Sequence, residues 1–412
     1  MALFAIFAIV NTANALNKGG DASVFFEGGR RLLDAAPLYE GSSAAAGFIG
    51  PPFQAVFFAP FAAIASVSDA TARLLWHAVN LAALAAGIWC AWRVWTIARA
   101  DMLRRPGDSH RGQSPVTVPA PGALSTAPPF PLLFAPIFAV LLPLQTNFEH
   151  QNMNALLFAL IAGATWQLTA GAAAAAGILI GAAAAIKVFP AILILWLLAR
   201  RMWATALIAL ATAAALTLIP LAIYGPASFA ELLETFSRLG SSGWPVRGNN
   251  QSLVAALDRL TSGVAHEGVR TAADAPTAAW LFVAAASILI AATGFLIART
   301  RAGAATIAVE AAAVTTLGVL LSPIAWDHYW TLLFPSFLLV YASGNRALLG
   351  KPGQWAFWIA AVLTTGLSPL TLGSRGFNAA REMSVDTLAG LIVFVTLVAL
   401  HKRTALLKVR GA

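Results

Sequence analysis

Long apolar runs alternate with short polar segments along almost the whole chain. A helix needs roughly 20 apolar residues to cross the hydrocarbon of a membrane, and twelve runs approach that length. They lie at residues 1–16, 70–97, 129–144, 154–169, 171–186, 190–199, 202–224, 279–297, 304–321, 329–343, 354–372 and 386–400. The pattern predicts an all-α, polytopic integral membrane protein with about twelve transmembrane helices, forming a single membrane domain over residues 1–412.

Two parts of this pattern leave room for other structures. The apolar piece 53–66 is short, follows Pro51 and Pro52 and contains Pro60, so we expect a re-entrant or interfacial helix there after the first outer loop. The three short runs between residues 154 and 199 would fit one long tilted helix plus a hairpin nearly as well. Small residues crowd the tract GAAAAAGILIGAAAAI at 171–186, which favours close helix packing over a cofactor site.

Positive charge orients the predicted spans. Of the 26 Lys and Arg, 14 fall in loops that contain only two acids, Asp101 and Asp108. These loops are 98–128, 200–201, 298–303, 344–353 and 401–412, and the positive-inside rule makes them cytoplasmic. The proline-rich segment 98–128 is then a flexible cytoplasmic linker, and the long segment 225–278 is an extracytoplasmic loop.

Composition supports a multi-pass membrane protein, and we expect it in the plasma (inner) membrane. Hydrophobic residues make up 59% of the chain and charged residues 10%, far from the balance of a soluble domain. A net charge of +9 would indicate nucleic acid in a soluble protein, but here the cations sit at the ends of apolar runs, so we expect membrane lipids and not nucleic acid as partners. Cys90 is the single cysteine, which excludes an intramolecular disulfide.

The dense polar clusters all fall on the predicted outer side. We therefore expect them to share one extracytoplasmic pocket, formed by Asp21, Glu149 to Asn154, Lys187, Asn249 to Gln251, and SPIAWDHYW at 322–330. No set of His, Asp and Glu has the spacing of metal ligands, so we expect neither a metal nor another cofactor.

Asp21 is the best candidate for a general base. A carboxylate at the bilayer centre would cost roughly 2.5–3.5 kcal/mol, which places Asp21 at the outer interface, where it could take a proton from a hydroxyl. It could equally be an interfacial acid that pairs with Lys18 or caps the next helix. Its position alone favours the second interpretation.

Each of the other polar candidates also has a structural alternative. Lys187 and His328 could bind a phosphate by charge-assisted hydrogen bonds, with Arg247 as a third candidate, while Lys187 could also snorkel to the interface. Candidate substrate-binding residues are Glu149, Gln151, Asn154, Asn250, Gln251 and Asp327. These could instead satisfy the backbone of turns and helix starts, and Asp327 could cap the helix that begins at His328. Glu310 lies inside a span near Arg299 and Arg301, and we assign it no catalytic role.

Several motifs, in order, resemble the family 87 glycosyltransferases of the GT-C superfamily. They are Asp21 after the first span, Gly28, Leu38-Tyr39, PPFQAVFFAPFAAI at 51–64, Leu75-Trp76 to Asn80, GILIGAAAAIKVFPAILIL at 177–195, GNNQSL at 248–253 and LLSPIAWDHYWTLLFP at 320–335. The resemblance implies a GT-C-like fold, an inverting mechanism, a sugar donor on polyprenyl phosphate, and Asp21 as the catalytic acid. The chain departs from the family pattern at Gly50, Pro51, Asn152 and Tyr329, which leaves the acceptor open.

The residues and the resemblance together predict a function. We expect an inverting hexosyltransferase that moves a sugar, with mannose favoured, from a polyprenyl-phosphate donor to a lipid-linked or cell-envelope glycan on the extracytoplasmic face. A phosphate leaving group already carries its charge, so one base and one cation suffice. The alternatives are a transporter or flippase for a lipid-linked sugar or small solute, and a non-catalytic scaffold of the cell envelope.

Overall fold

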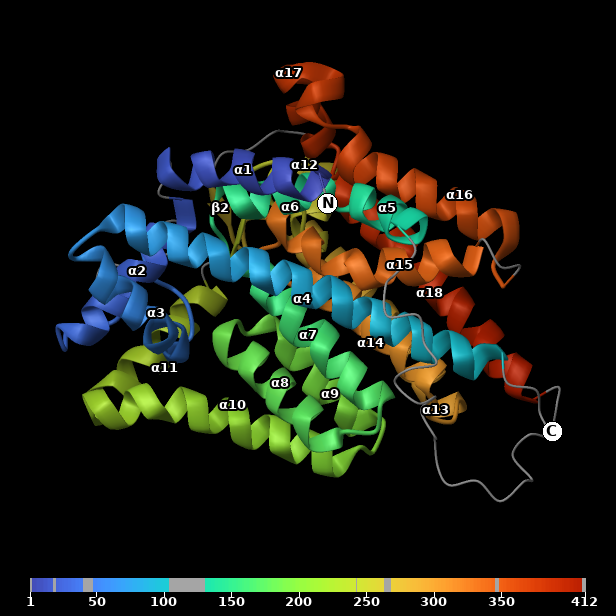
Figure 1. Cartoon of the computed structure of the whole chain (residues 1–412), viewed down its shortest axis with the longest axis horizontal. Helices are drawn as coiled ribbons and strands as arrows, with labels where there is room; N and C mark the ends of the chain where they lie inside the picture. The colour runs from blue at the N-terminus through green and yellow to red at the C-terminus, as the bar shows by residue number, and fades with distance from the viewer. Residues whose placement is uncertain are drawn as a thin grey trace.

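The computed structural model describes residues 2–17, 20–39, 47–103, 130–241, 243–262, 268–344 and 348–409. Within these ranges the fold is a bundle of helices, with one small antiparallel sheet of two strands (Figure 1). The linker predicted at 98–128 lies largely outside the described residues. The segment 225–278 contains helices and the two strands.

The elements follow one another along the chain as helices of very different length. They are α1 (Ala2–Asn17), α2 (Gly20–Leu33), α3 (Pro52–Ala65), α4 (Asp69–Leu103), α5 (Phe130–Ala139), α6 (Leu141–Glu149), α7 (Asn154–Thr169), α8 (Ala173–Ile186), η2 (Phe189–Ala191), α9 (Ile192–Ala199), α10 (Trp203–Tyr224), α11 (Pro226–Ser241), β1 (Trp244–Pro245), α12 (Leu253–Ser262), β2 (Val269–Arg270), α13 (Pro276–Arg299), α14 (Ala304–Leu321), η3 (Asp327–Leu333), α15 (Phe334–Gly344), α16 (Gly350–Ala361), η4 (Val362–Gly366), α17 (Pro369–Glu382) and α18 (Val385–Val409).

Among the described residues, five helices are long and apolar enough to cross a membrane: α4, α10, α13, α14 and α18. Two bent pairs raise this number to as many as seven, because α5 with α6 (58°) and the 350–366 helix with α17 (85°) could each be one broken span. The multi-pass, all-α prediction is confirmed. The count of twelve spans and the re-entrant path of 53–66 are not confirmed. The segment 53–66 lies in α3, a short apolar helix that contains Pro60. The three runs between 154 and 199 form separate helices.

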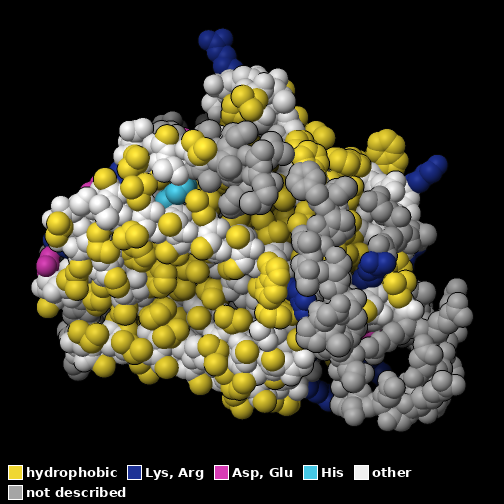
Figure 2. Space-filling view, viewed as in Figure 1, with side chains coloured by type: hydrophobic (Ala, Val, Ile, Leu, Met, Phe, Trp, Pro, Cys, Tyr) yellow, Lys and Arg dark blue, Asp and Glu magenta, His cyan; other side chains and the backbone are white. Residues whose placement is uncertain are grey.

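Burial separates a central helix from the helices that face outward. In α14, 89% of the apolar window is buried, whereas in α10 and α13 only 17% is. A helix that is apolar on all sides needs protein or lipid around it, so α10 and α13 are suited to face lipid. Figure 2 shows hydrophobic side chains over much of the surface formed by α4 and α10.

Glycines let α8 and α10 approach each other closely. A Cβ on Gly177 would lie 2.7 Å from the Thr205 carbonyl oxygen, and one on Gly181 would lie 2.4 Å from that of Ala209. Neither position has room for a larger side chain without moving the opposite backbone. The small-residue tract of the sequence is thus a packing surface, and it fixes the end of α8, where Lys187 follows.

A buried ionic cluster joins α14 and α18 to the residues that follow α9. Glu310 pairs with Arg200, accepts a hydrogen bond from Trp196 Nε1 (3.0 Å) and lies 2.6 Å from His401 Nε2. The sequence suggested Arg299 or Arg301 as partners, so the partner is corrected to Arg200, which helix packing brings close from a different part of the chain. These partners give the buried carboxylate of Glu310 a structural role.

Candidate active site

The first turn of α2 places Asp21 against the end of α6. The Asp21 backbone N–H donates to the His150 carbonyl oxygen at 2.8 Å. Gly20 has a positive φ of 51°, and a Cβ there would lie 2.5 Å from that same oxygen. Because only glycine accommodates both the backbone angle and the contact, the sequence Gly20-Asp21 fixes where the carboxylate enters the site.

A chain of two amide side chains connects Asp21 to Lys187. Asn152 Nδ2 donates to Asp21 Oδ2 at 2.5 Å, and Asn154 Nδ2 donates to Asn152 Oδ1 at 3.1 Å. Lys187 Nζ then donates to Asn154 Oδ1 at 3.3 Å. A carboxylate and an ammonium from distant parts of the sequence therefore lie at opposite ends of one hydrogen-bonded chain.

The turn that carries the two amides is held by its own contacts. Trp76 Nε1 donates to the Gln151 carbonyl oxygen (2.8 Å), and Gln151 Nε2 donates to the Ala15 carbonyl oxygen (2.9 Å). The φ of Gln151 is +49°, which is uncommon for a residue with a side chain. The Gln151 amide is thus directed to the backbone of α1, while Glu149 at the same turn is half-buried.

Lys187 lies just after the end of α8, in extended backbone. Its Nζ is 3.6 Å from the centroid of the Tyr329 ring, a cation–π contact. The neighbouring His328 ring lies 5.4 Å from that of Tyr329 and 5.9 Å from that of His150, measured between centroids. The α8 terminus and the start of η3 therefore meet at the same place.

Lys187 and His328 lie outside the candidate membrane spans. Burial lowers the pKa of both side chains. Desolvation lowers the pKa of Lys187 to about 7, with the negative charge of Asp21 acting in the opposite direction. Desolvation, followed by the charges of Lys187 and His150, holds the pKa of His328 well below its ordinary value. His328 is therefore neutral near pH 7 and offers a hydrogen bond but no charge.

The amides of the GNNQSL segment bind backbone groups. Asn250 Nδ2 donates to the carbonyl oxygens of Pro245 (2.8 Å) and Pro323 (3.0 Å), and its Oδ1 accepts from the Ala325 N–H (2.9 Å). Gln251 Nε2 donates to the Arg381 carbonyl oxygen at 2.8 Å. Both side chains are fully buried, and they hold the residues that lead into His328.

The remaining candidates lie apart from the amide chain. Asp327 is buried and pairs with Arg381 of α17, so its partner is a distant arginine and not a neighbouring backbone N–H. Arg247 is exposed on the surface of its loop. Arg381 was missed by sequence reasoning, because a basic residue in the last turn of a polar helix is ordinary and gives no signal.

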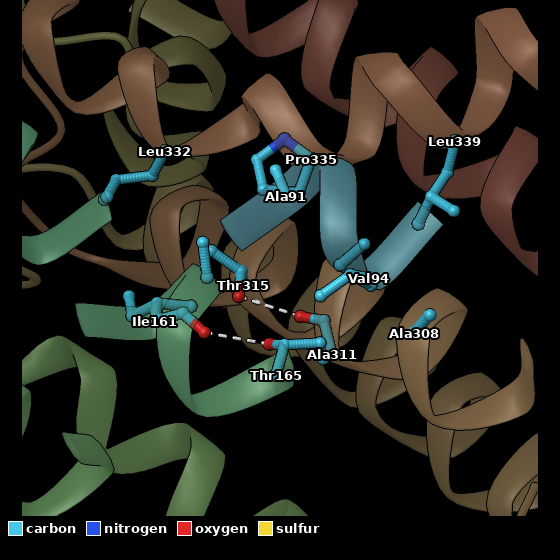
Figure 3. Close-up of a pocket in the computed structure, with 12 residues that line it drawn as sticks. Ala91, Val94, Ile161, Thr165, Ala308, Ala311, Thr315, Leu332, Pro335 and Leu339 are labelled. Carbon is cyan, nitrogen blue, oxygen red and sulfur yellow. Dashed lines mark hydrogen bonds between the residues drawn. The ribbon is translucent and has the colours of Figure 1, made fainter. Parts of the chain in front are cut away.

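A separate internal cavity of about 20 Å³ lies between α4, α7, α14 and the η3–α15 region (Figure 3). Its two hydroxyls are already satisfied, because Thr165 donates to the Ile161 carbonyl oxygen and Thr315 to that of Ala311. Its other lining residues are apolar, so it lacks the chemistry of the Asp21–Lys187 region. Over the ranges that the structure describes, no cluster of His, Cys, Asp and Glu could hold a metal ion.

Residues 48–323 match glycosyltransferase family 87. The chain belongs to this family. The match covers the amide turn, Lys187 and the GNNQSL segment, while Asp21 and His328 lie beyond its two ends. Family membership confirms the resemblance drawn from the motifs and makes the protein a glycosyltransferase, in preference to a transporter or scaffold.

Curated relatives come from mycobacteria. A polyprenol-phosphate-mannose-dependent alpha-(1-2)-phosphatidylinositol mannoside mannosyltransferase of Mycobacterium tuberculosis is 28% identical over 79% of this chain and 71% of its own length. The protein of the same description from Mycolicibacterium smegmatis is 25% identical over 85% of this chain and 76% of its own length. A polyprenol-phosphate-mannose-dependent alpha-(1-2)-phosphatidylinositol pentamannoside mannosyltransferase of Mycobacterium tuberculosis is 26% identical over 77% of this chain and 63% of its own length. No significant match is found among solved structures.

Proposed function

We propose that this glycosyltransferase moves mannose from a polyprenyl-phosphate donor to a phosphatidylinositol mannoside or a similar lipid-linked glycan, with inversion at the anomeric carbon. The observation that carries the proposal is the hydrogen-bonded chain from Asp21 to Lys187, which holds a base and a cation at its two ends. The activities named for the two mannosyltransferase relatives support the choice of donor and acceptor.

In this proposal Asp21 is the general base. Asn152 occupies Oδ2, which leaves Oδ1 to accept the proton of the acceptor hydroxyl. The hydroxyl oxygen forms a new bond to the anomeric carbon as the bond from that carbon to the phosphate oxygen breaks. The electron pair leaves with the polyprenyl phosphate, so no second carboxylic acid is needed to protonate the leaving group.

Lys187 is the cation that receives the departing phosphate. Below its lowered pKa of about 7 it carries a positive charge in a buried setting, where charge–charge attraction is stronger than in water. Neutral His328 adds a hydrogen bond to the phosphate, and exposed Arg247 contributes from the outer loop. Glu149, Gln151, Asn154, Asn250, Gln251 and Asp327 form or support the walls for sugar and acceptor.

We place the site on the extracytoplasmic side of the plasma membrane, with α3 as a re-entrant or interfacial helix. The distribution of Lys and Arg supports this orientation. Within the described residues, five helices are long and apolar enough to cross the membrane, and the two bent pairs raise this number to as many as seven.

Replacing Asp21 tests the base directly. Membranes with Asp21→Asn should transfer labelled mannose from polyprenyl-phosphate mannose to a purified phosphatidylinositol mannoside at least about 100-fold more slowly than wild type, because a general base contributes roughly 10²- to 10⁴-fold. The amide keeps the shape of the carboxyl group and can still accept from Asn152. Expression should be normal.

Asp34→Asn is the matched control, since Asp34 follows the same helix and its side chain is 53% exposed. It should transfer mannose at the wild-type rate. Wild-type transfer by Asp21→Asn at normal expression would remove Asp21 from the mechanism, and absence of transfer by the wild-type protein would instead count against the donor or acceptor.

A further inference from the structure

The helix α17 stands out from the body of the molecule at the top of Figure 1. It follows an 85° bend, and its first part is exposed, with Leu370 96% exposed and Arg375 also at the surface. Its last turn is different. Ala380 is buried and the Arg381 side chain is only 23% exposed, so the helix returns to the protein at this point.

Arg381 contacts two segments that belong to the site. Its guanidinium pairs with Asp327, and its carbonyl oxygen accepts from Gln251 Nε2 at 2.8 Å. The guanidinium also lies 4.3 Å from the centroid of the Phe377 ring. The same loop approaches α17 at Gly248, where a Cβ would lie 2.6 Å from Glu382 Oε1. The end of α17 is thus packed into the GNNQSL and SPIAWDH segments together.

These contacts fix both ends of the strip of chain that leads to His328. At its beginning, Asn250 binds the carbonyl oxygen of Pro323 and the N–H of Ala325. At its end, Arg381 holds Asp327, the first residue of η3. The segment is thus held by side-chain contacts at both of its ends. His328 and Tyr329 follow Asp327 directly in the chain, so the Arg381–Asp327 pair adjoins the residues whose rings lie near Lys187.

Arg381 itself is not among the contacts of the Asp21–Lys187 chain. Asp327 stands between Arg381 and the rings, and the further acids that interact with the guanidinium charge are Asp386 and Glu149. One route from Arg381 to the site therefore runs through Asp327, η3 and Tyr329 to Lys187 Nζ, which lies on the Tyr329 ring. A second is electrostatic, through the charge of Glu149.

We propose that Arg381 is a positioning residue for glycosyl transfer: by holding Asp327, it sets η3 so that Tyr329 orients Lys187 and His328 faces the donor phosphate. This inference rests on the function proposed above. It also links the projecting helix α17 to the donor site, because Arg381 in its last turn pairs with Asp327 of η3.

Steady-state kinetics separate this role from general stabilisation. Arg381→Gln should lower kcat about 100-fold with little change in the donor KM, because small misplacements of a reacting geometry cost that much. Arg381→Lys keeps the charge and should recover part of the loss. Arg375→Gln, an exposed arginine on the same helix, should behave as wild type in both parameters.

A buried carboxylate left without its partner destabilises a protein. A second variant therefore separates an effect on stability from an effect on positioning. In Asp327→Asn/Arg381→Gln neither group is charged, and the thermal unfolding midpoint should return toward that of wild type. Its kcat should be no lower than that of the worse single variant, because the two residues act as one pair. Independent, multiplying losses would overturn the pairing.

Chemical labelling tests the geometry without relying on transfer. Diethyl pyrocarbonate should modify buried His328 several-fold faster in Arg381→Gln than in wild type or Arg375→Gln, with exposed His150 as the internal reference in peptide mass spectrometry. Unchanged labelling of His328, or a wild-type kcat in Arg381→Gln, would overturn the proposal. If wild-type protein transfers no mannose, the proposed function fails, while the labelling result still decides whether Arg381 fixes the position of His328.

Discussion

At the scale of single residues, the site is organised around a buried ammonium. Lys187 Nζ has three N–H donors; Asn154 accepts one of them, and the Tyr329 ring lies against the charge. Burial without a direct carboxylate partner destabilises the charged form, which is why the pKa of Lys187 falls to about 7. The phosphodiester of the incoming donor carries one negative charge and supplies what is missing, so donor binding relieves the penalty.

This arrangement predicts a pH dependence with a definite sign. The free enzyme has a charged Lys187 below pH about 7 and a neutral one above it, so kcat/KM for the donor should fall as pH rises through that value. The groups that face Lys187 are Asp21, Asn154, His328 and Tyr329. In Lys187→Arg the fall should disappear, because a guanidinium stays charged throughout, and transfer should be higher than in Lys187→Ala.

Lys351→Ala, which alters an exposed lysine at the start of α16, is the control and should keep the wild-type profile. A Lys187→Ala enzyme with unchanged kcat/KM at roughly pH 6, where the native residue is charged, would show that this ammonium does not bind the donor phosphate.

At the scale of elements, helix ends and not helix middles build the site. Asp21 is at the start of α2, Asn154 at the start of α7, Lys187 after the end of α8, and His328 at the start of η3. Their geometry is consequently only as accurate as the packing of the helices behind them. The contact of α8 with α10 through Gly177 and Gly181 is one of these supports.

Enlarging Gly181 should therefore affect both stability and activity. Gly181→Val forces a side chain against the Ala209 carbonyl oxygen, 2.4 Å from the Cβ position, and should cost roughly 1–3 kcal/mol of stability. Because α8 leads into Lys187, the donor KM should also rise. Thermal unfolding in detergent and the transfer assay measure the two effects.

Gly294→Val in α13 is the matched control, since a Cβ at Gly294 meets nothing within 4 Å. It should leave the unfolding midpoint and KM near wild type. An equal effect of both substitutions would mean that the change in helix propensity, and not the α8–α10 contact, is responsible.

At the scale of the whole molecule, two separate groups of polar residues can be distinguished. One is the Asp21–Lys187 chain with its neighbours, and the other is the Glu310 cluster. The ends of α6 and α8 and the starts of α2, α7 and η3 meet at the Asp21–Lys187 chain. Arg200, Glu310 and His401 form their own closed network near residues predicted to be cytoplasmic. This separation gives sidedness a direct test.

Cysteine labelling in a Cys90→Ala background should report the orientation. Single cysteines at the exposed positions 150 and 247 should react with a membrane-impermeant maleimide in intact cells, because both are predicted to be extracytoplasmic. Cysteines at the exposed positions 301 and 351 should react only after permeabilisation. Labelling of 150 and 247 from different sides would contradict a shared outer pocket.

The structure brings together several residues that the sequence grouped into one site, while their roles in binding and catalysis stay predictions. The sequence placed Asp21, the amide turn, Lys187 and the WDH segment near one another, and the structure brings them together. It offered backbone binding by Asn250 and Gln251 only as an alternative, without their partners, and it did not show that Glu310 pairs with Arg200 or that Arg381 holds Asp327. Each of these pairs joins residues far apart in the chain.

The sequence by itself determined the helical membrane architecture, the boundaries of α7, α8 and α14 to within a few residues, and membership of the glycosyltransferase family. It could do so because apolar run length, proline position and motif order are local properties. Only the tertiary structure decided which helix ends meet, since that depends on how whole helices pack and tilt. The amide chain from Asp21 to Lys187, the α8–α10 approach and the Arg381–Asp327 pair all arise from that packing.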